Sequence, residues 1–325
     1  RFADLIGTRH AIGVGSGTDA LKLPLKAVGV GHGDEVITTA NTFIATVGAI
    51  NEIGATPVFV DCDDTFCMDV SQVEAAITER TRAIMPVQFT GEITDMPKLM
   101  EIADRHNLPV VEDACQGILA SIDGKRAGTW GIAGGFSLHP LKNLNVWGDG
   151  GVIVTNDDEV AAKLRLLRNH GLQNRDEIAL LGYNSRLDTL QAIVGNWLIG
   201  DTHDITQKRI DNAAVYDAAF ADVPQITIPP RRDNVKRVFH LYIVFAEDRD
   251  DLYEYCLEKG VEAKIHYPIP LYLQEGLAHL GYKVGDFPVT DRHAKNIITF
   301  PTDQHLNPEQ LDIVIQTVRD FYAGN

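Results

Sequence analysis

Short apolar runs alternate with longer amphipathic segments along the first part of the chain. Runs rich in Val and Ile, as strands are, lie at residues 34–39, 56–61, 82–87 and 108–113. Between them lie segments such as 95–107, DMPKLMEIADRHN, in which apolar residues recur at helical spacing. Strands that alternate with helices predict βαβ units and a mostly parallel sheet.

Two glycine-flanked runs, at 134–139 and 150–156, are joined by a short loop, and we expect neighbouring strands there, close to an active site. The pattern changes after about residue 204. A helix at 205–223 is followed by a proline-punctuated stretch, a strand at 238–246, a helix at 249–260, a strand at 261–268 and a closing helix at 307–324. The chain is therefore predicted to form a large domain over 1–204 and a smaller α+β domain over 205–325.

Composition narrows the class of protein. With 325 residues and 45% hydrophobic content, the chain is long enough to bury a large core. A net charge of −16 without a basic cluster argues against a nucleic-acid partner. The four cysteines form no C-x-x-C pair, so neither a metal site nor a disulfide framework is indicated. No signal peptide or long apolar span is present, which predicts a cytoplasmic protein without a membrane partner. Because the sequence opens at Arg1 without a methionine, we expect a further segment before it.

The segment AIGVGSGTDALKL, residues 11–23, has the form of a glycine-rich turn between a strand and a helix. Such turns bind anions, because backbone N–H groups and the positive end of the helix dipole converge there. The glycine spacing is not that of the dinucleotide fingerprint, and no Gly-Lys-Ser/Thr follows as in a P-loop. On these residues alone, a phosphate site and a tightly packed helix remain equally open.

Two further segments carry candidate chemistry. In FSLHPLKNLNVWGDGG, 136–151, Lys142 is crowded by Ser137 and His139. It is either an exposed loop lysine or a Schiff-base lysine, whose amine must be partly desolvated to be nucleophilic. In VVEDACQG, 110–117, Asp113 ends a strand, where ligands bind in open α/β sheets. It either caps the next helix or faces the pyridine nitrogen of pyridoxal phosphate, which needs a carboxylate there.

Taken together, these blocks resemble the DegT/DnrJ/EryC1/StrS family of pyridoxal phosphate-dependent sugar aminotransferases, and the resemblance covers essentially the whole chain. The family's blocks occur in the family's order, with GYNSRLDTLQAIV (182–194) and KIHYPIPLYLQ (264–274) completing the set. The resemblance implies fold type I, a large and mostly parallel sheet domain with helices on both faces plus a smaller C-terminal α+β domain. It also implies pyridoxal 5′-phosphate as cofactor and no metal.

The resemblance assigns roles residue by residue. Lys142 and Asp113 are the implied catalytic residues, Lys142 as the Schiff-base lysine and Asp113 as partner of the ring nitrogen. The implied cofactor contacts are Gln116 at the ring hydroxyl, Phe43 on the ring face, and Gly17, Thr18, Asp19 and Ser137 at the phosphate. Asn184 of a neighbouring subunit completes the phosphate site, which implies a homodimer with shared sites. Arg186, His266 and Tyr267 are candidate substrate contacts, although His266 could equally be a loop histidine and a lone aromatic such as Phe43 is often a core residue.

The implied reaction moves an amino group, from glutamate, to a keto-sugar in two half-reactions. The default acceptor is a nucleotide-linked keto-deoxysugar, in amino-sugar biosynthesis for cell-surface polysaccharide or lipopolysaccharide. A nucleotide-free oxidised sugar acid, giving an 8-amino-3,8-dideoxy-octulosonate, is the alternative acceptor. A lyase of the same fold and a non-catalytic regulator are the alternative functions. Lys142 argues against the family's dehydratase branch, in which histidine replaces that lysine.

Overall fold

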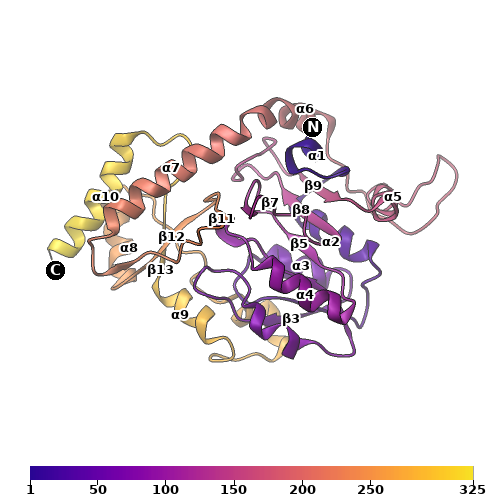
Figure 1. Cartoon of the computed structure of the whole chain (residues 1–325), viewed down its shortest axis with the longest axis horizontal. Coiled ribbons are helices and arrows are strands. Elements are labelled where there is room, and N and C mark those ends of the chain that lie inside the picture. The colour runs from indigo at the N-terminus through magenta and orange to yellow at the C-terminus, as the bar shows by residue number, and fades with distance from the viewer. Residues whose placement is uncertain (325) are drawn as a thin grey trace.

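One large sheet organises the N-terminal part of the chain (Figure 1). The computed structural model describes residues 1–324. Hydrogen-bonded strands follow one another in the orders β1-β9-β8-β5 and β4-β2-β3, and parallel bridges from Ile84 to Val110 and from Val87 to Asp113 join β4 to β5. The strands are β1 (His10–Val14), β2 (Glu35–Thr39), β3 (Thr56–Val60), β4 (Thr81–Met85), β5 (Val111–Asp113), β8 (Ala133–Ser137) and β9 (Gly151–Thr155). The strands predicted at 34–39, 56–61, 82–87 and 108–113 are confirmed.

Strand β9 alone runs against its neighbours in this sheet. It pairs antiparallel with β8 on one side, Ser137 opposite Gly151, and with β1 on the other, Val14 opposite Gly151. The remaining pairs, β2 with β3, β2 with β4 and β5 with β8, are parallel. The prediction of two neighbouring strands at 134–139 and 150–156 is therefore correct, and the loop between them carries Lys142.

Helices cover both faces of the sheet, because alternate strand residues point to opposite sides. On one face Val36 and Val111 pack against Leu21 and Leu25 of α2 (Gly17–Ala27). On the other face Ile37 packs in the same cluster as Leu99 of α4 (Met96–His106). The helices of this part are α1 (Phe2–Ile6), α2 (Gly17–Ala27), α3 (Ile44–Asn51), α4 (Met96–His106), α5 (Asp158–Leu167) and α6 (Thr189–Leu198), with single-turn 3₁₀ segments at 70–72, 74–76, 89–91 and 199–201. This is the mostly parallel α/β arrangement that the sequence predicted.

The C-terminal part has a separate hydrophobic core, in which Tyr216, Tyr242, Phe300 and Val318 are buried. Its antiparallel sheet has the order β10-β12-β13. Its elements are α7 (Thr202–Phe220), β10 (Ile226–Thr227), β12 (Tyr242–Ala246), α8 (Arg249–Glu258), α9 (Pro288–Asn296), β13 (Ile297–Phe300) and α10 (Pro308–Ala323), with 3₁₀ segments at 271–273 and 275–280. Figure 1 shows α7 running from α6 to the C-terminal group of α8 and α10. The division at residue 204 stays a prediction.

Two details differ from the expected layout. The strand predicted at 261–268 is wrong, because only Lys264 pairs with Thr299 and the chain then leaves the sheet toward Pro268. The chain also contains a small second sheet, in which β6 (Ser121–Ile122) pairs with β7 (Lys125–Arg126) and with β11 (Val235–Lys236). Through β11, the C-terminal part of the chain is hydrogen-bonded to the N-terminal part.

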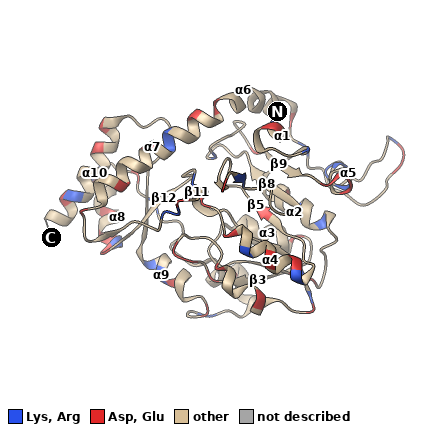
Figure 2. Cartoon of the chain, viewed as in Figure 1, with Lys and Arg blue, Asp and Glu red and all other residues tan. Residues whose placement is uncertain are grey.

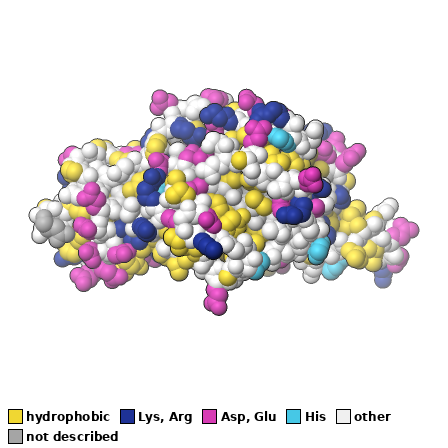
Figure 3. All heavy atoms as spheres, turned by 90° about the horizontal axis from the view of Figure 1, so that it is seen from below, with side chains coloured by type: hydrophobic (Ala, Val, Ile, Leu, Met, Phe, Trp, Pro, Cys, Tyr) yellow, Lys and Arg dark blue, Asp and Glu magenta, His cyan; other side chains and the backbone are white. Residues whose placement is uncertain are grey.

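Charged residues of both signs are interspersed on the outer helices α4, α7 and α10 (Figure 2). On the face seen from below, hydrophobic side chains gather toward the middle, between scattered charged ones (Figure 3). Of the helices within residues 1–324, none has the length and apolar content needed to cross a membrane.

Candidate active site

A cavity of about 370 Å³ lies where β5 and β8 end and α2 begins. This is the edge of a parallel sheet at which ligands bind in α/β proteins. Most of the residues singled out from the sequence line it, namely Gly17, Thr18, Phe43, Asp113, Gln116, Ser137, Lys142, His266 and Tyr267. The fold thus brings together residues from five separate stretches of sequence.

The start of α2 forms one wall of this cavity. Ser16 caps the helix, its hydroxyl accepting a hydrogen bond from the Asp19 N–H at 3.1 Å. The N–H groups of Gly17 and Thr18 come first in the helix and have no helical carbonyl to bond. A Cβ on Gly17 would lie 2.6 Å from Ser137 Cβ, so only glycine lets the helix start approach this side chain. Two free N–H groups, a hydroxyl and the helix dipole together favour an anion.

Asp113 is buried at the cavity with a fixed carboxylate. Its Oδ2 accepts a hydrogen bond from Thr46 Oγ1 at 2.7 Å, and its Oδ1 accepts one from the Cys115 N–H at 3.1 Å. The preceding Glu112 points to the opposite side of β5, where its carboxylate accepts backbone N–H bonds from Gly128 and Trp130 at 2.8 and 2.7 Å. Asp113 therefore faces the cavity, and Glu112 supports the fold.

Lys142 lies in the loop after β8, where its N–H donates to the His139 carbonyl at 2.8 Å. Burial lowers the pKa of its amine, although the nearby Asp113 carboxylate acts in the opposite direction. A lowered pKa raises the fraction of uncharged amine, which is the nucleophilic form. The Lys142 amine is thus desolvated and not fully exposed, and its role as a Schiff-base lysine stays a prediction.

Gln116 is oriented by the backbone of a neighbouring turn. Its Oε1 accepts a hydrogen bond from the Thr90 N–H at 2.7 Å. The carbonyl end of the amide is therefore occupied, and the NH₂ end is the one available to a ligand. This orientation suits an acceptor group on the ligand, such as a ring hydroxylate.

Aromatic residues flank the mouth of the cavity. Phe43 precedes α3, is 51% exposed, and lies with its ring centroid 6.2 Å from that of Tyr267. Burial raises the pKa of Tyr267 to about 12. Burial lowers the pKa of the neighbouring His266 to about 4, and its Nδ1 lies 2.9 Å from Thr299 Oγ1. His266 therefore lies in the cavity wall with its ring held by Thr299, and its predicted contact with the substrate stays a prediction.

Three predicted residues do not line this cavity: Asp19, Asn184 and Arg186. The Asp19 carboxylate pairs with Lys22 at 2.7 Å and accepts a hydrogen bond from Ser185 Oγ at 2.7 Å. Asn184 is exposed, and Arg186 donates to Asn169 at 3.1 Å. Their predicted contacts with cofactor, partner or substrate stay predictions.

Sequence reasoning missed several residues of the site. Thr46 holds Asp113, and Thr90 orients Gln116. The Ser185 hydroxyl accepts a hydrogen bond from the Gly15 N–H at 3.0 Å. This bond connects the segment around Asn184 to the glycine-rich turn. His240 has its Nε2 3.5 Å from the Lys142 amine. Ser185 stood inside a recognised block, but nothing in the sequence distinguished His240 from its strand neighbours.

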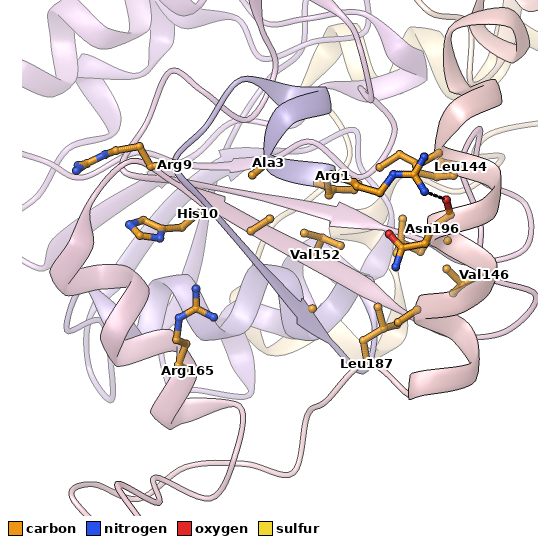
Figure 4. Close-up of a pocket in the computed structure, with 17 residues that line it drawn as sticks. Arg1, Ala3, Arg9, His10, Leu144, Val146, Val152, Arg165, Leu187 and Asn196 are labelled. Carbon is orange, nitrogen blue, oxygen red and sulfur yellow. Dashed lines mark hydrogen bonds between the residues drawn. The ribbon is translucent and has the colours of Figure 1, made fainter.

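A second cavity, of about 400 Å³, lies beside α6 on the outer side of β1 and β9 (Figure 4). Figure 4 shows Arg9, His10 and Arg165 toward one end, and Leu187 and Asn196 toward the other. Within residues 1–324, none of the predicted cofactor residues lines it. The predicted cofactor residues that line a cavity thus line the first one.

The first cavity fits pyridoxal 5′-phosphate. The helix start with Ser137 would hold the phosphate, Asp113 the pyridine nitrogen, and Gln116 the ring hydroxyl. Lys142 would supply the amine that bonds the cofactor aldehyde. The close approach that only Gly17 permits and the buried, hydrogen-bonded carboxylate are the observations that carry this assignment.

Comparisons with known proteins agree with this geometry. A sequence profile of the DegT/DnrJ/EryC1/StrS aminotransferase family matches residues 1–319. The pleiotropic regulatory protein of Geobacillus stearothermophilus is 44% identical over 97% of this chain and 85% of its own length. The dTDP-3-amino-3,4,6-trideoxy-alpha-D-glucose transaminase of Micromonospora megalomicea subsp. nigra is 41% identical over 99% of this chain and 88% of its own.

Among solved structures, S. venezuelae DesV in complex with a ketimine intermediate superposes with a TM-score of 0.96. The two chains are 39% identical, and the match covers 98% of this chain and 86% of that one. The fold is thus that of fold type I aminotransferases. The chain belongs to the DegT/DnrJ/EryC1/StrS aminotransferase family and is a pyridoxal 5′-phosphate-dependent aminotransferase.

Proposed function

We propose that this aminotransferase moves the amino group of glutamate to the carbonyl of a nucleotide-linked keto-deoxysugar. The product is an amino sugar for cell-surface polysaccharide or lipopolysaccharide. The assembly of Lys142, Asp113 and the anion-binding start of α2 in one cavity carries the proposal. The transaminase named above acts on a dTDP-linked sugar, which supports a nucleotide on the acceptor.

Each residue of the site has a defined task. When bound, the cofactor supplies an aldehyde that takes up amino groups and a pyridine ring that draws electrons from the reacting carbon. Asp113 would hold a proton at the ring nitrogen and so keep the ring electron-poor. Lys142, when its amine is free, would take a proton at Nζ from the substrate carbon and later give it back, acting first as general base and then as general acid. The α2 N-terminus and Ser137 would hold the phosphate.

We further propose that the enzyme is a homodimer in which Asn184 of each chain reaches the other's phosphate site. Exposed apolar side chains along α6 support this, because Leu190, Ile193 and Trp197 lie on one side of the helix and are 74%, 60% and 65% exposed. Trp197 also meets the exposed Trp147, their ring centroids 6.0 Å apart. Apolar patches of this kind mark interfaces.

Complementation tests the shared site. A Lys142→Ala chain and an Asn184→Ala chain, each inactive alone, are mixed and allowed to exchange subunits. In a symmetric dimer, one of the two sites then carries neither change, and we expect partial recovery of activity. If heterodimers form without recovering activity, Asn184 does not act across the interface.

Substrate assignment is tested by incubating the purified enzyme with glutamate and single keto-sugars while 2-oxoglutarate release is followed. We expect turnover with UDP- or dTDP-linked keto-sugars and none with Lys142→Ala. Release of 2-oxoglutarate with an oxidised eight-carbon sugar acid, and not with nucleotide-linked keto-sugars, would support the nucleotide-free sugar acid as the acceptor. Turnover without any keto acceptor would indicate a lyase. A regulator would release no 2-oxoglutarate with any acceptor, but the intact set of Lys142, Asp113 and Gln116 does not favour that alternative.

A further inference from the structure

His240 lies directly against the amine that the proposed reaction uses. It precedes β12, lines the cavity, and places its Nε2 3.5 Å from Lys142 Nζ. This distance is at the outer limit of a hydrogen bond. The two residues are far apart in sequence and meet only because the C-terminal part of the chain folds back onto the large sheet.

The backbone around His240 is fixed from the large-sheet side. The Leu241 N–H donates to the Thr90 carbonyl at 3.3 Å, and the Val238 N–H donates to the Gly91 carbonyl at 2.9 Å. Gly91 has a φ of 89°, and a Cβ there would lie 2.9 Å from the backbone nitrogen of His240. Only glycine at position 91 therefore permits this approach. The same Thr90 orients Gln116 through its own N–H, so one turn positions both side chains.

A second support comes from α7. The Arg209 guanidinium donates to the carbonyls of both Phe239 and His240, each at 3.3 Å. Asn143, next to Lys142, donates to the Val238 carbonyl at 3.3 Å. The segment that carries His240 is thus hydrogen-bonded to the loop that carries Lys142. The pair is held together by its surroundings and does not depend on the 3.5 Å contact alone.

Burial and the neighbouring cationic groups favour the neutral form of the His240 imidazole. Burial lowers the pKa of His240 well below its usual value, and the groups that add to this effect are Lys142, Arg209, His266 and His139. Its Nδ1 is buried and meets no hydrogen-bonding protein atom within residues 1–324. No carboxylate backs the ring, in contrast to a histidine that acts as a strong base. When the Lys142 amine is protonated it has donors only, so a neutral ring pairs with that form only through a lone pair on Nε2.

Resting on the proposed role of Lys142, we propose that His240 is the hydrogen-bond acceptor that holds the Lys142 amine in the cavity whenever the amine is not bonded to the cofactor. His240 then acts through Lys142 and takes no proton itself. In each half-reaction the lysine must leave the cofactor, transfer a proton and return. A fixed acceptor keeps the long, flexible side chain within reach of the reacting carbon during that interval.

The test measures the Lys142 amine in the apoenzyme. The rate of pyridoxal 5′-phosphate capture, trapped by borohydride and mapped to Lys142, is followed against pH for wild type, His240→Leu and His240→Gln. Leucine removes the acceptor that favours the ammonium, so the midpoint of the profile should fall by about one pH unit. Glutamine keeps an acceptor and should restore the wild-type midpoint. The exposed His32, before β2, gives the control His32→Leu, which should leave the profile unmoved.

Turnover gives a second readout. We expect His240→Leu to lower kcat roughly tenfold or more with little change in KM, and His240→Gln to recover most of it. An unchanged or raised midpoint in His240→Leu would overturn the proposal. If His240→Leu does not fold, the ¹⁵N chemical shifts of the wild-type His240 imidazole test the proposal instead. The proposal requires a hydrogen on Nδ1 and none on Nε2. The opposite tautomer or a charged ring would refute it. Capture at a lysine other than Lys142 would instead refute the proposed function.

Discussion

Gly17→Ala tests whether the start of α2 holds the cofactor phosphate. The backbone at Gly17 is helical, so alanine introduces no strain in φ and is a better helix former. The new Cβ would lie 2.6 Å from Ser137 Cβ and 2.8 Å from its Oγ, whereas carbon atoms pack at about 3.5–4.0 Å. The helix start and Ser137 must therefore separate by roughly 1 Å.

Such a displacement opens the anion site without removing any of its groups. We expect the affinity of the apoenzyme for pyridoxal 5′-phosphate, from an absorbance titration, to fall about tenfold or more, as when one charge-assisted hydrogen bond is lost. Turnover at saturating cofactor should fall on the order of 10²-fold, because the ring moves relative to Lys142. Pyridoxal, which has no phosphate, should lose much less affinity than the phosphorylated cofactor.

The matched control is Gly48→Ala in α3, where a Cβ would meet no atom within 4 Å. It should bind and turn over as wild type does. If Gly17→Ala binds pyridoxal 5′-phosphate within twofold of wild type, the phosphate does not lie at this helix start. An equal loss for pyridoxal and its phosphate would also refute the reasoning.

Asp113→Asn should lower kcat on the order of 10²-fold with the fold intact. Glu112→Gln, on the other side of β5, should lower Tm and leave kcat unchanged. Equal losses of kcat in the two variants would contradict the separate roles of Asp113 and Glu112. Burial lowers the pKa of His293 to about 4 from 6.5, so the unfolded chain binds its proton first as pH falls. Thermal unfolding should therefore show stability lost between pH 6.5 and 4, roughly 3 kcal/mol from this group by pH 4, and a smaller loss in His293→Gln. Ile193→Asp on α6 should shift the enzyme to monomers in analytical ultracentrifugation, while Val284→Asp, at an exposed site elsewhere, should not; a dimeric Ile193→Asp would exclude α6 from the interface.

The sequence predicted those parts of the molecule that local pattern controls. The strands of the large sheet are short Val- and Ile-rich runs, and the sheet edge places Asp113 and Ser137 together because both end parallel strands. The strand expected at 261–268 does not form, because Pro268 has no N–H to donate and because His266 and Tyr267 lie in the cavity wall.

Long-range partners could not be predicted in this way. Thr46 and Thr90 matter through single hydrogen bonds to residues distant in sequence, and a threonine in a helix or a turn gives no signal of such a bond. His240 stands before an ordinary strand and gains its place only when the C-terminal part of the chain packs on the large sheet. The resemblance to a family supplied the roles, but the structure supplied the groups that hold them in position.

The antiparallel strand β9 has a consequence for the order in which the protein can be made. β1 is attached to the large sheet through β9 alone, with His10 opposite Thr155. During synthesis from the N-terminus, β1 and the glycine-rich turn after it must therefore wait until β8, the Lys142 loop and β9 have emerged. Contacts of such long sequence separation form slowly, because the intervening chain must be ordered first. We therefore expect β1 and the turn after it to reach their final place only once the Lys142 loop and β9 have been made, since β9 is the strand that pairs with β1.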